Sequence, residues 1–249
     1  MVITIANQKG GQAKTTSAIN IGAGLTGLDK KILLIDLDSQ TNLSTSLGII
    51  EENTEYTIND VIGKKINIKK AIIRLDNGMS IIPASHRLTG TSMILKKSDV
   101  LKELLKDIKN DYDFVIIDTQ PSLSILTVNA LATSNEIWIT FQPEYLAMTG
   151  IKDLLNTIEL LKDKFGIDPE IRIIITMYDS RKLLHREAIG SIKKHFKNVF
   201  KTMIRTNVSL AEAPSHALDI FEYKPDSHGA LDYANLCKEI LRKAKWIKN

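Results

Sequence analysis

The sequence predicts an α/β protein with a doubly wound, mostly parallel sheet and helices on both faces. First, short β-branched apolar runs alternate along the chain with longer segments in which apolar residues recur at helical spacing. Second, several of these runs end directly in carboxylates or in a glycine-containing loop, and ligand-binding groups in open parallel sheets follow the carboxyl ends of the strands. The length of 249 residues, 43% of them hydrophobic, suits one domain with a sizeable core.

The elements follow in order from these patterns. The first predicted strand, Val2–Ile5, leads through a loop into a helix that begins near Lys14. The later predicted strands occupy residues 31–38, 79–85 (where the strand leads into a loop), 113–118, 136–140 and 171–176. The later predicted helices occupy residues 98–108 with Ser98 as N-cap, 146–164, a segment that closes at 193–197, and 229–247. Residues 51–75 are polar and predict a surface helical insertion, with their lysines on a solvated face.

Composition narrows the function classes. The formal net charge of +4 permits contact with nucleic acid but does not demand it. The single cysteine, Cys237, excludes a disulfide framework and a metal site built on paired cysteines. The sequence has neither an apolar run of about 18 residues nor a signal peptide, and neither a repeat nor a linker divides it. We therefore expect a cytoplasmic protein with one domain over residues 1–249.

The stretch Val2–Thr16 predicts a phosphate-binding site. A strand, a glycine-containing loop and a helix in this order direct free backbone N–H groups and the positive end of the helix dipole at an anion. Lys14 would neutralise β- and γ-phosphate oxygens, the Thr15 hydroxyl would bind Mg²⁺, and Thr16 could donate to the α-phosphate. The strict pattern G-x-x-x-x-G-K-[ST] is not met, because Gln8 and Ala13 occupy its glycine positions. The variant K-G-G-x-x-K-T is met, by Lys9, Gly10, Gly11, Lys14 and Thr15.

This loop resembles the deviant Walker A motif of P-loop ATPases of the ParA/Soj and MinD type. The resemblance implies that Lys9 reaches across a dimer interface to the nucleotide of the partner subunit. It also implies a departure at Ala13, where the family usually has glycine; if the backbone there needs a positive φ, alanine costs about 1 kcal/mol. The expected nucleotide-binding residues of the loop are Lys9, Gly10, Gly11, Gln12, Ala13, Lys14, Thr15 and Thr16.

Three aspartates at the ends of predicted strands complete the expected chemistry. Asp36 and Asp38 end the second strand, and they lie beside the phosphate loop if this strand neighbours the first. Asp118 ends a later apolar strand in the Walker B arrangement, placed to hold Mg²⁺ through water. Residues 36–44 resemble the family's D-x-D-P-Q segment, which implies that Asp38 orients the attacking water and that Asp36 supports Mg²⁺ from beyond its direct ligands. Solvated strand-end aspartates without a ligand are the alternative.

Further resemblance in the second half of the chain implies contacts to adenine and DNA. Residues 176–181 and 204–216 resemble family segments near the adenine, which makes Met177, Asn207 and Pro214 candidate base contacts. Thr206 and His228 replace basic residues that contribute to non-specific DNA binding in the family, and Gln120 is a further departure beside the γ-phosphate. The remaining candidate DNA contacts are the basic residues Lys193, Lys194, Arg205, Arg242, Lys243 and Lys245, for which a merely solvated face is the alternative.

The resemblance, which spans residues 1–245, implies a partition ATPase that uses ATP and Mg²⁺, with Lys9, Lys14 and Asp38 as catalytic residues. ATP would produce a homodimer that binds DNA non-specifically and associates with the nucleoid, and a ParB-type protein would reset it by stimulating hydrolysis. An N-terminal helix-turn-helix extension is not expected. One alternative is a MinD-like ATPase that cycles on membranes, although we expect no membrane contact. The other is a nucleotide-gated scaffold that hydrolyses ATP poorly because of Ala13.

Overall fold

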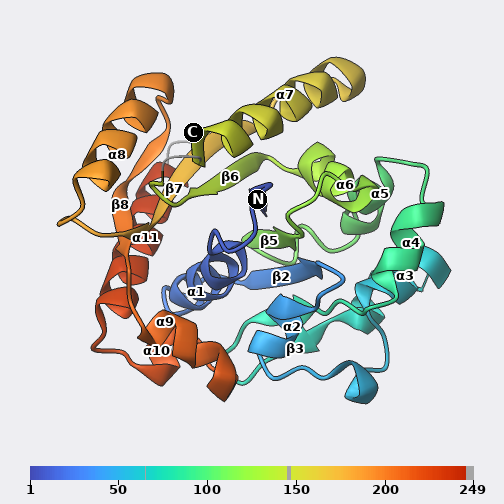
Figure 1. Ribbon diagram of the computed structural model, residues 1–249. Coiled ribbons are helices and arrows are strands. Elements are labelled where there is room, and N and C mark those ends of the chain that lie inside the picture. Colours follow the sequence, from blue (N-terminus) through green and yellow to red (C-terminus); the bar gives the residue numbers. More distant parts are fainter. Residues whose placement is uncertain (65, 145–146, 245–249) are drawn as a thin grey trace.

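The computed structural model describes residues 1–64, 66–144 and 147–244. Within that part of the chain, eight strands form one sheet in the order β3-β4-β2-β5-β1-β6-β7-β8 (Figure 1). Neighbouring strands pair in parallel except β3 and β4, which are antiparallel. The predicted doubly wound, mostly parallel sheet is confirmed. The strands are β1 Val2–Ala6, β2 Ile32–Leu37, β3 Ile73–Arg74, β4 Ser80–Ile82, β5 Phe114–Thr119, β6 Glu136–Phe141, β7 Glu170–Tyr178 and β8 Val199–Arg205.

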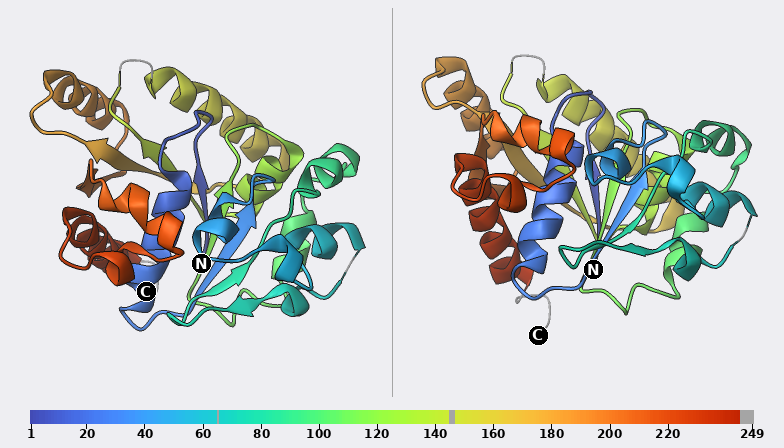
Figure 2. Two further views of the ribbon diagram at one scale, coloured as in Figure 1. Left: turned by 60° about the horizontal axis from the view of Figure 1, so that its bottom comes forward. Right: turned by 90° about the horizontal axis from the view of Figure 1, so that it is seen from below.

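Helices cover both faces of this sheet (Figure 2). Helices α1 and α11 pack together on one face, and α3 to α8 cover the other. The α-helices are α1 Lys14–Thr26, α2 Asn42–Ser46, α3 Ile58–Lys64, α4 Leu88–Ile94, α5 Val100–Leu105, α6 Ile125–Thr133, α7 Ala147–Phe165, α8 Leu183–His195, α9 Ser209–Glu212, α10 Ile220–Tyr223 and α11 His228–Ala244. Three short 3₁₀ turns are η1 Glu51–Asn53, η2 Ile68–Ala71 and η3 Ala213–His216.

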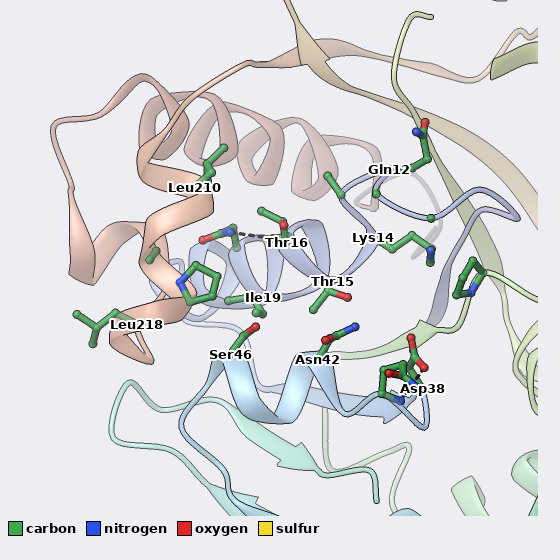
Figure 3. A pocket seen from close by; sticks show the side chains of 18 residues that line it. Gln12, Lys14, Thr15, Thr16, Ile19, Asp38, Asn42, Ser46, Leu210 and Leu218 are labelled. Atoms are coloured by element: carbon green, nitrogen blue, oxygen red, sulfur yellow. Dashed lines mark hydrogen bonds between the residues drawn. The ribbon is translucent and has the colours of Figure 1, made fainter. Parts of the chain in front are cut away.

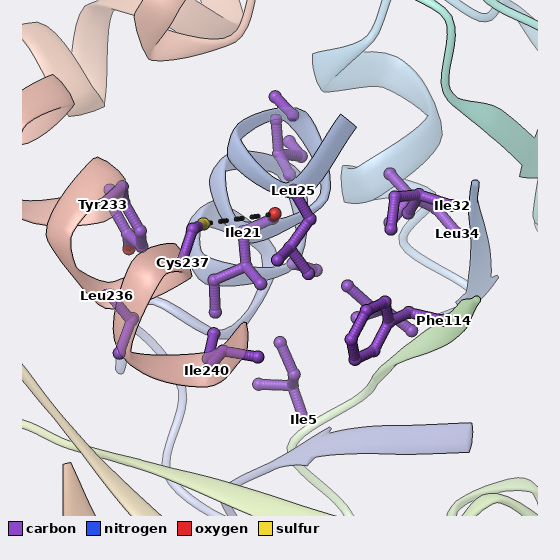
Figure 4. Packing of buried hydrophobic residues seen from close by; sticks show 14 of the residues in the cluster. Ile5, Ile21, Leu25, Ile32, Leu34, Phe114, Tyr233, Leu236, Cys237 and Ile240 are labelled. Atoms are coloured by element: carbon purple, nitrogen blue, oxygen red, sulfur yellow. Dashed lines mark hydrogen bonds between the residues drawn. The ribbon is translucent and has the colours of Figure 1, made fainter. Parts of the chain in front are cut away.

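The central strands β1, β2 and β5 are largely apolar because both of their faces are buried. In β1, Ile3 and Ile5 face the side of the sheet that α1 and α11 cover, whereas Val2 faces α5 and α6. The core between α1 and α11 is closely packed, and Figure 4 shows Cys237 of α11 beside Ile21 of α1, whose carbonyl accepts a hydrogen bond from Cys237 Sγ at 3.5 Å. Packing against α11 and the sheet therefore fixes α1, and with it the loop that precedes α1, at the centre of the sheet.

The strand order corrects one expectation about the site. Asp36 and Asp38 were expected beside the phosphate loop on the condition that β2 neighbours β1. Instead β5 lies between the two strands, and Asp36 of β2 pairs in register with Asp118 of β5. Because parallel strands end at the same edge of the sheet, the carboxylates still gather there, with Asp118 next to β1 and Asp36 one strand further away.

Two local expectations were wrong, and the strand β8 was not expected. Residues 51–75 are not a surface insertion, since Ile58 and Val61 of α3 are buried against the sheet and 73–74 form the antiparallel edge strand. Helix α5 begins at Val100 after Asp99, so Ser98 is not its N-cap. Strand β8 was not predicted, because the polar residues Lys201 and Thr202 interrupt its apolar run and only Phe200 and Ile204 are fully buried.

Candidate functional site

A cavity of about 390 Å³ opens at the carboxyl ends of the central strands. Three segments line it: residues 10–20 from the phosphate loop and α1, residues 38–46 after β2, and residues 210–218 around η3. Pro121, which follows β5, completes the lining. Figure 3 shows Lys14 and Asp38 at one end of the cavity and Leu210 and Leu218 at the other. The cavity therefore has a charged end and an apolar end, as a nucleotide requires for its phosphates and its base.

The phosphate loop joins β1 to α1 through two residues with positive φ. Gly11 has φ +70°, and Ala13 has φ 59° and ψ 31°, in the left-handed region. Ala13 is the N-cap of α1, and its side chain cannot accept a hydrogen bond from the first helical turn. The N–H groups of that turn are therefore available to an anion in the cavity. Ala13 therefore has the positive φ at which alanine costs about 1 kcal/mol relative to glycine.

Lys14 is almost fully buried at the charged end of the cavity, with 7% of its surface exposed. Burial lowers its pKa, and the nearby Asp118 and Asp38 carboxylates oppose that shift. Asp38 also lines the cavity, and its Oδ1 accepts a hydrogen bond from the Gln40 N–H at 2.9 Å. A buried ammonium in this position is stabilised by any phosphate that enters the cavity.

Asp36 and Asp118 form a buried pair of like charges at the ends of β2 and β5. Burial raises the pKa of Asp118 to about 7, and the neighbouring Asp36 adds to the shift. Burial likewise raises the pKa of Asp36 to about 6, against hydrogen bonds that its carboxylate accepts from the Ser44 hydroxyl and N–H at 2.7 and 2.9 Å. Asp36 is thus held by Ser44, whereas Asp118 faces Thr15.

The donor set around Asp118 fits a magnesium ion. Asp118 Oδ2 accepts a hydrogen bond from the Thr15 hydroxyl at 2.6 Å, and Oδ1, although buried, has no hydrogen-bond partner among the described residues. A hydroxyl and a carboxylate are oxygen ligands of the kind that Mg²⁺ prefers. No group of three or more His, Cys, Asp or Glu side chains in the described ranges is arranged to hold a metal. An ion here would therefore take its remaining ligands from phosphate oxygens and water.

Lys9 is not among the described residues that line the cavity. Its ammonium instead forms an ion pair with Glu144, with Nζ and Oε2 3.0 Å apart, and both side chains are nearly half exposed. Glu144 lies in the segment between β6 and α7. Of the eight loop residues predicted to bind nucleotide, the seven from Gly10 to Thr16 line the cavity, and Lys9 points elsewhere.

At the apolar end, Pro214 lines the cavity, which leaves its predicted contact with adenine a prediction, whereas Met177 and Asn207 are not among the described lining residues. Both instead hold the segment that forms the wall: the Met177 carbonyl accepts a hydrogen bond from the Thr206 hydroxyl at 3.0 Å, and Asn207 Oδ1 accepts one from the Leu210 N–H at 3.3 Å. Their contact with adenine stays a prediction. The described lining residues that were not predicted are Ile19, Asn20, Gln40, Asn42, Ser46, Pro121, Leu210, Ala213 and Leu218. Of these, Gln40, Asn42, Leu210 and Ala213 lie in segments that resemble the family.

The basic residues predicted to contact DNA differ in whether a carboxylate of the same chain already pairs with them. Lys193 and Lys194 at the end of α8 are exposed, as is Arg242 of α11. Arg205 is bound to Asp232, with Nη2 and Oδ1 2.7 Å apart and Nε donating to Oδ2 at 2.9 Å. Lys243 Nζ lies 3.6 Å from Glu239 Oε1 and above the Phe200 ring. Lys245 lies outside the described residues.

Thr206 and His228, which replace basic residues of the family, both lie on the surface. Thr206 is exposed while its hydroxyl donates to Met177, and His228 is exposed at the first position of α11. Gln120, the departure beside the predicted γ-phosphate position, donates a hydrogen bond to the Ser124 hydroxyl, which is the N-cap of α6. Gln120 therefore stabilises the turn after β5. Among the described helices, none is long and apolar enough to cross a membrane.

The strand, loop and helix around Lys14 and Thr15, together with an aspartate at the end of the adjacent strand, define a P-loop nucleoside triphosphatase. A protein-family model described as an AAA domain (AAA_31) matches residues 1–173. The chain also belongs to the ParA/Soj-type family of chromosome-partitioning ATPases, as the following relatives show.

Two relatives are similar over almost their whole length. The sporulation initiation inhibitor protein Soj of Bacillus subtilis (strain 168) is 40% identical over 248 residues, which cover 96% of this chain and 97% of the relative. The chromosome-partitioning ATPase Soj of Treponema pallidum (strain Nichols) is also 40% identical, over 97% of both chains. Among solved structures, cobyrinic acid a,c-diamide synthase from Mycobacterium smegmatis with bound ADP and magnesium is 30% identical, covers 98% of this chain and 95% of its own, and has a TM-score of 0.85.

Proposed function

We propose that this chain is a partition ATPase that switches between a monomer and an ATP-bound homodimer. The dimer binds DNA non-specifically on the nucleoid, and a ParB-type partner stimulates ATP hydrolysis and returns the chain to the monomer. Membership of the ParA/Soj family supports the partition function, and the charged and apolar ends of the cavity support ATP and Mg²⁺ as cofactors. The proposal includes a cytoplasmic location.

The residues of the charged end have distinct roles in the transfer of the γ-phosphoryl group to water. Lys14 and the N–H groups at the start of α1 bind phosphate oxygens and stabilise the charge that develops on them. Asp38 orients the attacking water. Thr15 and Asp118 would hold Mg²⁺, which supplies positive charge next to the phosphates when bound. Asp36 would support the ion from beyond its direct ligands.

The position of Lys9 is the observation that carries the dimer proposal. A lysine that served its own subunit's nucleotide would line its own cavity, as Lys14 does. Lys9 instead points out of the cavity and is held by the half-exposed Glu144 at the surface. Exposed ion pairs of this kind contribute only about 0.2–1 kcal/mol, so the phosphates of a second subunit can displace Glu144 readily.

Exposed basic residues support the DNA proposal. Lys193 and Lys194 at the end of α8 and Arg242 of α11 are free to release counterions from DNA. Arg205 is unsuited to this role because Asp232 already neutralises it. The proposed DNA surface thus consists of α8 and α11 rather than of the segment around Thr206.

Sedimentation velocity of the Asp38→Ala variant with ATP and Mg²⁺ tests the proposal, with and without duplex DNA at two salt concentrations. We expect an ATP-dependent dimer that binds DNA and loses it as the salt concentration rises. The matched control is Lys9→Ala in the same background, which should bind ATP and remain a monomer. A dimer indifferent to DNA would contradict the DNA step and favour a membrane- or protein-directed relative, and a dimer that survives Lys9→Ala would contradict the role of Lys9.

A second candidate function, a nucleotide-gated scaffold with poor hydrolysis, is favoured by one observation. Ala13 has the left-handed backbone that glycine adopts at lower cost, and its Cβ lies in the loop that binds the phosphates. If this function is right, Ala13→Gly raises the ATP turnover rate or the affinity for ATP. An unchanged rate and affinity would rule out Ala13 as a cause of poor hydrolysis.

A further inference from the structure

The phosphate loop contains a polar side chain that the proposed chemistry does not use. Gln12 lines the cavity, yet only 2% of its surface is exposed. Figure 3 shows its amide pointing away from Thr15 and Asp38, the residues of the charged end. A buried amide needs hydrogen-bond partners, so its surroundings explain its position.

The partners of Gln12 belong to the segment that follows β6. Gln12 Nε2 donates to Gln142 Oε1 at 3.2 Å, and the Gln142 backbone N–H donates to Gln12 Oε1 at 3.2 Å. The end of β6 itself holds the start of the loop, because Asn7 Nδ2 donates to the Thr140 carbonyl at 2.6 Å. The loop is therefore bound at both ends to the exit of β6, which is part of the rigid sheet.

Gln12 lies between the two residues of the loop that have positive φ. Gly11 adopts φ +70° without a steric cost, but Ala13 at φ 59° carries a Cβ that disfavours this conformation. A strained residue persists only where the surrounding structure fixes it. The reciprocal pair of hydrogen bonds between Gln12 and Gln142 fixes the residue directly before Ala13.

We propose that Gln12 is a positioning residue for nucleotide binding, whose paired hydrogen bonds with Gln142 hold the loop in the left-handed turn at Ala13. The inference rests on the proposed binding of ATP in this cavity. Gln12 acts on the phosphates through the backbone of the loop: with the pair intact, the N–H groups of the loop and of the first turn of α1 are already directed at the anion. Without it, Ala13 relaxes toward negative φ and those groups turn away.

A double-mutant cycle between residues 12 and 13 tests this inference. Isothermal titration with AMPPNP and Mg²⁺ is carried out on the wild type, Gln12→Met, Ala13→Gly and the double variant. Methionine keeps the length of the side chain but lacks the amide. We expect Gln12→Met to weaken binding about fivefold, as the net loss of hydrogen bonds predicts, and to weaken it less than twofold in the Ala13→Gly background.

Gln8→Met is the matched control, since Gln8 lies in the same loop and its Nε2, although buried, has no hydrogen-bond partner among the described residues. We expect this variant to bind AMPPNP like the wild type, and circular dichroism to show that every variant is folded. Equal losses from Gln12→Met in both backgrounds would overturn the inference, because the amide would then not act through the strained turn. A loss in neither background would overturn it as well. Failure of the wild type to bind AMPPNP would contradict the proposed function instead.

Discussion

The charged end and the apolar end of the cavity differ in how the chain builds them. At the charged end, the lining residues 10–16 are one continuous stretch, the loop after β1 and the first residues of α1, and α1 packs on the centre of the sheet, where β1 lies. At the apolar end, the wall is the segment 210–218, which reaches the cavity only through packing between parts of the chain far apart in sequence. Local sequence therefore determines the first end, and long-range packing determines the second.

Hydrogen bonds show the same difference. The side chain of Lys14 is placed by the helix that it begins. The wall at Leu210 is held instead by the hydrogen bond that the Leu210 N–H donates to Asn207 Oδ1, and by the one that the Thr206 hydroxyl donates to the carbonyl of Met177 in β7. This comparison predicts that substitutions at the charged end reduce nucleotide binding strongly, whereas those at the apolar end reduce it moderately.

The largest expected effect is that of Lys14→Gln. The variant removes a buried positive charge that the phosphates would contact, and hydrogen bonds to charged groups contribute about 1.5–3 kcal/mol each. We expect the affinity for AMPPNP and Mg²⁺, measured by isothermal titration, to fall about 30- to 100-fold. Lys194→Gln, at the exposed end of α8, is the control and should leave it unchanged. A smaller loss for Lys14→Gln than for a substitution at Leu210 would reverse the comparison.

Asp118→Asn tests the electrostatic state of the charged end without nucleotide. Burial raises the pKa of Asp118 to about 7, above its value in the unfolded chain, so the folded state favours the protonated form. The resulting stability is fully present below about pH 4 and is lost as the pH rises through about 7. An asparagine stays neutral, so we expect the variant to match the wild type at pH 4 and to exceed it by about 2–4 kcal/mol at pH 8. Urea unfolding without Mg²⁺ at the two pH values measures this difference.

Asp179→Asn is the control of opposite sign. Hydrogen bonds from Arg181 hold the pKa of Asp179 below its usual range, so its contribution to stability is present above the unfolded pKa and is lost as the pH falls. We therefore expect Asp179→Asn to lower stability at pH 8 and still at pH 4, and the difference from the wild type to shrink only as the pH falls below the unfolded pKa of about 4. If the unfolding free energies of Asp118→Asn and the wild type ran parallel across the pH range, the ionised pair of Asp36 and Asp118 would not be a source of strain.

At the apolar end, Leu210→Ala separates the wall of the cavity from the residues that hold it. Leu210 lines the cavity, so its truncation removes apolar contact with a base and should weaken AMPPNP binding about three- to tenfold. Met177→Ala should change it less than twofold, because the Met177 side chain is not among the described lining residues and its backbone carbonyl, which binds Thr206, remains. A larger loss for Met177→Ala would show that binding closes the cavity around Met177, as its predicted adenine contact requires.

The same difference explains what the sequence alone could predict. The central strands and the phosphate loop were predictable because apolar runs and the Lys14-Thr15 pair are local signals. The interposed β5 and the in-register contact of Asp36 with Asp118 were not, because strand order depends on packing between whole elements. The ion pair of Lys9 with Glu144 spans 135 positions of the chain, and no local pattern records it. Residues 204–216 were noted for their resemblance to the family, but their role as the apolar wall of the cavity was not predicted. An apolar side chain such as Leu210 does not by itself indicate contact with a ligand.

The smallest expected effects are on the salt dependence of DNA binding. The candidate DNA contacts again fall into two kinds, exposed basic residues and paired ones. Lys193 and Lys194 are exposed, whereas Arg205 is bound to Asp232 by hydrogen bonds from its side chain and its backbone. Each lysine that contacts a phosphate releases counterions, so Lys193→Gln and Lys194→Gln should each reduce the slope of log K against log salt by about 1. Fluorescence anisotropy with a labelled duplex and the ATP-bound Asp38→Ala protein measures this slope.

Arg205→Gln should leave the slope unchanged and lower the stability of the fold, because it leaves the nearly buried Asp232 carboxylate without its cation. Thermal unfolding of the same three variants distinguishes the two roles: the lysine variants should unfold like the wild type, and Arg205→Gln at a lower temperature. A reduced slope for Arg205→Gln would mean that the ATP-bound state breaks the pair with Asp232 and presents Arg205 to DNA. The segment around Thr206 would then bind DNA after all, and the apolar end of the cavity would be coupled directly to the DNA surface.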